Sequence, residues 1–356
     1  GHLPTRPRLT DSRYTPICGR NVVPTRISTK PNSQVPPRPN VVGWLLTATA
    51  AVGLLGVAIE SMLGYGPWMA LFWHEQWMSP LVTPLTGMSW NEYVSSASTT
   101  AALGWVGFGI GVFYGLAGLM CIVGRPRWLV ASALMLAAGL LGLDAWLSYH
   151  SHGGRVFQGL EHALQVFAPL AVVSWLLFAW RGNEVRWALR LAVSLTFFSH
   201  GLWALGASLA WGPVHLDYPT PGEWVDMVMK VFPLMDEQTA RSFLQVAGVL
   251  DLAVAAAMLL PDKVARPVLV WAIIWGALTA AARIVAHFDD VSWADSMGYW
   301  WSQALRRAPH AGLPLALWLM LRQRASAPSA DATADELSWK PVVEQVEQAN
   351  TPASRT

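Results

Sequence analysis

Charged residues are scarce in this sequence. Asp, Glu, Lys and Arg make up only 13% of its 356 residues, whereas hydrophobic residues make up 53% and the mean hydropathy is +0.35. Soluble globular domains carry about 25% charged residues, so this composition excludes that class. A formal net charge of +2 gives no reason to expect a nucleic-acid partner. The sequence therefore predicts a polytopic membrane protein whose surroundings are the lipid bilayer.

Cysteine is nearly absent as well. Cys18 lies in a polar stretch and Cys121 in an apolar run, and the sequence has only these two. They exclude a disulfide framework and a thiolate metal site. The sequence also contains no nucleophile elbow, phosphate-binding loop, Cys-x-x-Cys pair or dinucleotide fingerprint. Any activity must then come from polar residues within the membrane or from a partner subunit.

Two polar segments flank the apolar part of the chain. Residues 1–40 are rich in Pro, Arg, Ser and Thr, and they lack an apolar core followed by a small-residue cleavage site. We interpret them as a disordered, basic cytoplasmic tail and not as a signal peptide. Residues 323–356 are polar and Ala/Ser-rich, which predicts a second disordered cytoplasmic tail.

Apolar runs between these tails are long enough to cross a bilayer, which takes about 20 residues per helix. Counting them predicts an all-α protein with eight transmembrane helices, near Val41–Met62, Ala102–Val123, Trp128–Tyr149, Gln158–Trp180, Trp187–Leu209, Ser242–Leu260, Pro267–His287 and Trp301–Leu321. Threading eight helices places four basic loops on one side, whereas residues 63–101, on the other side, contain no Lys or Arg. The four loops are those around Arg125/Arg127, Arg181/Arg186, Lys263/Arg266 and Arg322/Arg324. The positive-inside rule then predicts cytoplasmic termini in a bacterial-type inner membrane.

The chain also repeats itself at an offset of about 140 residues, because each half has a span, a long outer loop and three further spans. Four spans per half give both halves the same orientation, so we expect two parallel-repeat four-helix bundles. The predicted units are residues 41–182 and 183–322. Glu60 in the first unit stands where His200 stands in the second, and Tyr114 stands where Asp251 stands.

Ionisable residues concentrate in the second unit. The stretch from Thr279 to Trp318 forms two apolar runs across a short acidic and aromatic turn, and helix depth at 1.5 Å per residue puts several of its polar residues in one layer with His200 and Asp251. The predicted catalytic residues are His200, Asp251, Arg283, Arg306 and His310, and the predicted cofactor-binding residues are His287 and Arg307. Charged residues within membrane helices usually face a bundle interior or a watery cavity. The alternative is that the arginines extend to the outer headgroups and His200 bonds a neighbouring helix.

The first unit suggests a weaker metal hypothesis. His150, His152 and His162 lie near carboxylates, and imidazole binds copper and zinc. The His-x-His pair alone falls short of the three or four protein ligands of a zinc site, and no paired histidine spacing singles out a haem site. The segment Gly222–Phe232 mixes Trp and Met with carboxylates, which predicts a short helix on the outer surface, either an anchor or a lid over a substrate site.

Short motifs of the second unit resemble a known family. Phe198-Ser199-His200-Gly201-Leu202-Trp203, then Gly248-Val249-Leu250-Asp251, then Arg266-Pro267 leading to Thr279-Ala280-Ala281-Ala282-Arg283, are similar to the DoxX/DoxD-like membrane proteins. The resemblance implies a four-helix membrane fold, in which a glycine is followed by an acid three residues later. It also implies membership of membrane redox complexes such as thiosulfate:quinone oxidoreductases.

Three functional hypotheses follow. The first is an integral membrane subunit of a redox complex that contacts quinone through the second-unit residues and assembles with protein partner subunits. The second is a small-solute or proton-coupled transporter, and the third is a non-catalytic membrane anchor. A partner that carries flavin, haem or sulfur chemistry would favour the first, because the sequence holds no such domain.

Overall fold

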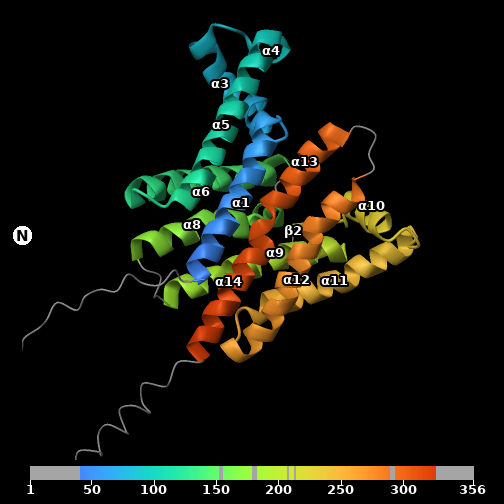
Figure 1. The fold of residues 1–356 in the computed structure, drawn as a ribbon. Helices are drawn as coiled ribbons and strands as arrows, with labels where there is room; N and C mark the ends of the chain where they lie inside the picture. Colours follow the sequence, from blue (N-terminus) through green and yellow to red (C-terminus); the bar gives the residue numbers. More distant parts are fainter. Residues whose placement is uncertain are drawn as a thin grey trace, which may run out of the picture. The chain divides into compact units, whose positions relative to one another are not determined.

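A computed structural model describes residues 41–151, 155–178, 183–206, 208–211, 214–288 and 293–325. Within these ranges the regular structure is helical apart from a short antiparallel hairpin of β1 (Ser208–Trp211) and β2 (Val214–Asp217) (Figure 1). Seven helical segments in the described ranges are long and apolar enough to cross a membrane. The helical, membrane-compatible class predicted from the composition is confirmed.

The first group of long helices forms a closed ring. Its members are α1 (Val41–Met62), α5 (Ala97–Val123), α6 (Arg127–Ser151) and α8 (Ala163–Phe178), the last preceded by the single turn α7 (Val156–Leu160). In the ring α1 packs on α5, α5 on α6, α6 on α8 and α8 on α1. Three short helices join α1 to α5: α2 (Trp68–Phe72), α3 (Glu75–Thr86) and α4 (Trp90–Ser95). The Ser89 hydroxyl and backbone N–H bond to Glu92 at the start of α4, which lowers the pKa of Glu92 below its ordinary value.

A second ring follows in the sequence. It contains α9 (Asn183–Leu205), α11 (Glu237–Ala257), α12 (Asp262–Ala286) and the pair α13 (Trp293–Arg306) and α14 (Ala308–Ala325). Here α9 packs on α11, α11 on α12, α12 on α14 and α14 on α9. The short helix α10 (Gly222–Val231) rests against α11 and α12. The helix predicted at Gly222–Phe232 is thus present.

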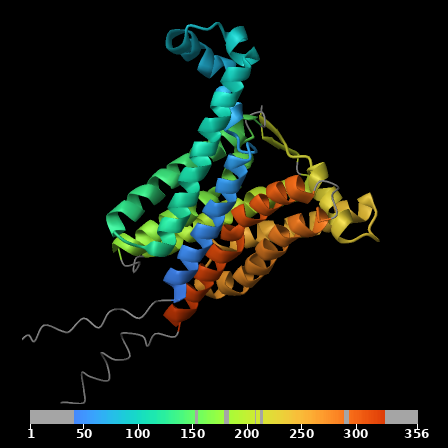
Figure 2. The ribbon, with the colours of Figure 1, turned by 45° about the horizontal axis from the view of Figure 1, so that its top comes forward.

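The two rings meet along α1, which contacts α13 and α14, and along α8, which contacts α9 and α14 (Figures 1 and 2). Gly56 permits a close approach of the two backbones, because a Cβ atom there would lie 2.2 Å from the backbone nitrogen of Arg306. Gly276 does the same between α12 and α14, where a Cβ atom would lie 2.4 Å from the carbonyl oxygen of His310. Small residues at such positions let membrane helices pack backbone against backbone.

The predicted eighth span is not a single helix in the structure. The sequence predicted one helix over 301–321, but α13 ends at Arg306 and α14 begins at Ala308. Pro309 explains the break, because it has no N–H to offer to the carbonyl group of Leu305 and its ring crowds that turn. The seven candidate spans do not include α13 or α14, so the eight-span architecture stays a prediction. The predicted helix 187–209 also ends earlier, at Leu205, because Gly206 adopts a positive φ of 64°.

The orientation of the helices is testable. We expect an impermeant thiol reagent, applied to intact cells, to label single cysteines at the exposed positions Ser98 and Gln238 of a cysteine-free variant, because the loops 63–101 and 210–241 are predicted to lie outside. Lys263→Cys is the control, since its exposed loop is predicted to be cytoplasmic. Labelling of Lys263→Cys from outside would reverse the predicted orientation.

Candidate functional site

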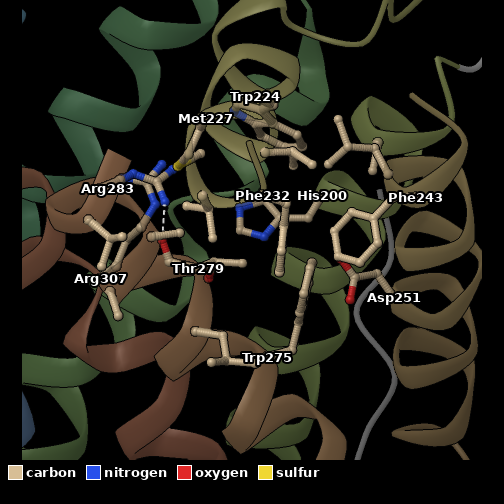
Figure 3. A pocket seen from close by; sticks show the side chains of 18 of the residues that line it. His200, Trp224, Met227, Phe232, Phe243, Asp251, Trp275, Thr279, Arg283 and Arg307 are labelled. Carbon is tan, nitrogen blue, oxygen red and sulfur yellow. Dashed lines mark hydrogen bonds between the residues drawn. The ribbon is translucent and has the colours of Figure 1, made fainter. Parts of the chain in front are cut away.

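A cavity of about 450 Å³ lies inside the second ring. Its walls come from α9, α10, α11 and α12, with Arg307 reaching in from the break between α13 and α14 (Figure 3). Most of the lining is apolar, including Trp224, Val228, Phe243 and Trp275. A cavity of this size and lining, with a few polar groups, is typical of a small-molecule site.

Asp251 contributes a carboxyl group to the lining of the cavity. The residue is buried, with 2% of it exposed. Its Oδ1 makes no hydrogen bond of normal geometry in the described part of the chain, although the indole N–H groups of Trp275 and Trp271 lie close enough to interact with the carboxyl group. Asp251 lies here because α9 and α11 pack closely. Gly248 permits this packing, since a Cβ atom on it would lie 2.8 Å from the carbonyl oxygen of Gly201. A buried polar atom without a partner is costly, so Asp251 is a candidate to bind a ligand.

Two histidines stack at the wall of the same cavity. The ring of His200 lines the cavity, and the ring of His310 lies parallel to it with 5.3 Å between centroids and 9° between planes. His310 is buried, and its Nδ1 has no hydrogen-bond partner among the described residues. His200 can therefore exchange hydrogen bonds with a ligand, while His310 supports it from behind.

Two arginines approach from the opposite side. Figure 3 shows Arg283 and Arg307 together on one side of the cavity, Asp251 on the other and His200 between them. Arg283, 6% exposed, donates from Nη1 to the carbonyl oxygen of Thr279 at 2.6 Å, and Arg307 donates from Nη1 to Oε1 of Gln303 at 3.0 Å. The cavity thus offers guanidinium donors at one end and a carboxyl group at the other.

The surroundings suggest how a ligand could enter. Trp224, Met227 and Val231 of α10 line the cavity, so this helix covers it as a lid would. On α12 the lining includes Leu278 and Val285, which are 55% and 60% exposed. The cavity therefore reaches the surface at an apolar rim, which in a bilayer would face lipid chains.

Arg306 points away from the cavity into a second polar site. Its guanidinium donates from Nη1 to Oε2 of Glu60 at 2.8 Å, from Nη2 to Asp144, and from Nε to Oε1 of Gln165 at 3.0 Å. Nδ1 of His162 lies 3.2 Å from Nη2 and 2.8 Å from Gln165 Oε1. All five residues are buried, and the four partners of Arg306 belong to the first ring. We call Glu60, Asp144, His162, Gln165 and Arg306 the interface cluster.

The structure therefore divides the residues predicted as one site. His200, Asp251, Arg283 and Arg307 meet at the cavity, and His310 stacks behind His200. Arg306 belongs to the interface cluster instead. His287 lies outside the cavity at the end of α12, where its ring stacks on Trp300 with 3.5 Å between centroids and Lys230 Nζ lies 3.3 Å from its Nδ1.

The predicted metal ligands do not come together in the described residues. His150 packs against the rings of Trp146 and Trp77, whereas His162 belongs to the interface cluster. His152 lies outside the described residues. No group of three or more His, Cys, Asp or Glu side chains in the described ranges could hold a metal ion.

Sequence reasoning did not find that Glu60 and Asp144 pair with Arg306. A signal was present, because Glu60 is the one ionisable residue in the 22-residue helix α1 and Asp144 lies within an apolar run. Acids inside apolar helices need a cationic partner. Arg306 and Arg307 are adjacent in the last predicted span, so one of the two was available as that partner.

Comparison of the chain with protein-family models, with curated proteins and with solved structures finds no match. The resemblance to DoxX/DoxD-like proteins thus rests on the motifs quoted from the sequence. The structure adds the positions of these motifs: His200, Asp251 and Arg283 all line one cavity.

Proposed function

We propose that the chain is an integral membrane subunit of a redox complex and that its cavity binds the head group of a lipid-soluble quinone. One observation carries this proposal: an apolar cavity with a surface-reaching apolar rim contains an imidazole and a buried carboxyl group, one oxygen of which makes no hydrogen bond of normal geometry among the described residues. A quinone needs an apolar environment for its ring and tail and hydrogen-bond donors for its two carbonyl oxygens.

The polar groups of the cavity suit the chemistry of such a ligand. Reduction of a quinone to the quinol takes two electrons and two protons. The electrons would come from a partner subunit, because the sequence has no motif for a redox cofactor. Asp251 and His200 could pass protons to the carbonyl oxygens, and Arg283 or Arg307 could donate hydrogen bonds that stabilise charge developing on them.

The proposed architecture is a duplicated four-helix unit. In both rings the four helices contact one another in the order of the chain, and the fourth packs back on the first. The fourth helix of each ring is interrupted, after Leu160 in the first ring and after Arg306 in the second. Pro169 and Pro314 follow these breaks at corresponding positions, each in the sequence Pro-Leu. This correspondence supports counting α13 and α14 together as the eighth span.

A second candidate function is a carrier for an amphipathic anion. Arg283 and Arg307 favour it, because two guanidinium groups at one end of an apolar cavity would bind an acidic head group. The two proposals differ in the expected ligand, so binding can separate them. A pure membrane anchor would bind neither.

Blocking the cavity tests the proposal. In nanodiscs the protein should bind a short-chain quinone analogue, and Ala282→Phe should weaken this binding about tenfold or more, because the new ring occupies the space of the ligand. Quenching of tryptophan fluorescence is a suitable measurement, since Trp224, Trp271 and Trp275 line the cavity. Ala277→Phe is the matched control, because Ala277 is exposed on the same helix outside the cavity.

The same assay should include an alkyl phosphate of equal chain length. Preference for the phosphate over the quinone would favour the carrier. Equal loss of quinone binding in the Ala282 and Ala277 variants, or no binding to the parent protein, would contradict a quinone site in this cavity.

A further inference from the structure

The charges of the interface cluster do not balance. If Glu60 and Asp144 are both ionised, they carry two negative charges against the single positive charge of Arg306. A buried charge without compensation costs several kcal/mol, so the cluster needs one additional positive charge.

A proton is the simplest source of that charge, and the hydrogen bonds indicate where it lies. Glu60 accepts at both oxygens, from Gln303 Nε2 at 3.0 Å and from Arg306 Nη1 at 2.8 Å, which suits an ionised carboxylate. Among the described residues Asp144 accepts a hydrogen bond only from Arg306 Nη2. Its other oxygen is therefore free to hold a proton.

An unpartnered hydroxyl group at the same place offers a test of this assignment. Tyr114 is fully buried, and its hydroxyl has no hydrogen-bond partner in the described part of the chain. Asp144, Arg306 and Glu60 all lie near enough to interact electrostatically with this hydroxyl. Removal of the hydroxyl therefore changes the electrostatic surroundings of the proton without breaking a hydrogen bond to Asp144.

We infer that the interface cluster is a buried proton-binding site that holds one proton on Asp144. The groups that face Asp144 are Glu60 on α1, Tyr114 on α5, His162 and Gln165 at the start of α8, and Arg306 on α13. The ligand of this site is the proton, whatever molecule the cavity binds.

Infrared spectroscopy of the purified full chain in nanodiscs tests the proton directly. In an Asp251→Asn background, which removes the other candidate acid, we expect the carbonyl band of a protonated carboxylic acid at neutral pH. Asp144→Asn and Glu60→Gln should each abolish the band, because either change leaves one carboxylate for one guanidinium. Tyr114→Phe should shift the band without abolishing it, and this variant breaks no side-chain hydrogen bond among the described residues. Glu92→Gln, on the exposed helix α4, should leave it unchanged.

Two outcomes would overturn the proton site. One is absence of the band in the Asp251→Asn background, and the other is its survival in both the Asp144 and Glu60 variants. Neither outcome depends on quinone binding.

Discussion

Replacing Arg306 by methionine should destabilise the protein more than any other single change considered. The methionine would leave Glu60 and Asp144 buried next to each other without the guanidinium that bonds to both. Removal of one partner from a buried ion pair costs about 3–5 kcal/mol, a large part of the about 5–15 kcal/mol that keeps a typical protein folded. The expected result is a much lower melting temperature and loss of the monodisperse peak in detergent.

Arg307 provides the matched control for this experiment. It is the next residue, but its guanidinium lines the cavity and donates to Gln303. Arg307→Met should therefore leave the melting temperature close to that of the parent. The triple variant Arg306→Met, Glu60→Gln and Asp144→Asn removes the charges together and should recover much of the stability. Equal melting of the Arg306 and Arg307 variants would contradict the importance of the interface cluster.

Asp251→Asn should have the opposite profile, with a large effect on ligand binding and a small effect on folding. Asparagine keeps the shape of aspartate but loses the charge and the exchangeable acid proton. Because a hydrogen bond to a charged group contributes about 1.5–3 kcal/mol, quinone affinity should fall about tenfold or more. The measurement is the quenching titration described for the cavity, together with a thermal melt of the same sample.

The corresponding position in the first unit supplies a control. Tyr114→Phe should leave binding in the second-unit cavity unchanged, because Tyr114 lies beside the interface cluster and not in the cavity. An Asn variant at 251 that binds as the parent does would remove the reason to regard Asp251 as part of a site. The membrane-anchor hypothesis would then be favoured.

The sequence was sufficient for features that depend on local composition. Helix α1 spans Val41–Met62 as predicted, because an uninterrupted apolar run of this length specifies a helix in either a membrane or a core. The helix α10 was predicted from its mixture of Trp, Met and carboxylates, although its role as a cover of the cavity was left open between anchor and lid. The shared depth of His200, Asp251 and His310 also predicted residues that now meet at or beside one cavity.

The division between the cavity and the interface cluster was decided by tertiary structure. Consecutive residues on a helix point about 100° apart, since a turn takes 3.6 residues, so Arg306 and Arg307 could not both face one site. Which of them faces Glu60 depends on the break before Pro309 and on the approach of α1 at Gly56. Glu60, Asp144 and Arg306 are separated by 84 to 246 positions along the chain. Composition and spacing identify buried charges that need partners, but only the packing of the helices selects the partners, because that choice depends on contacts between distant segments.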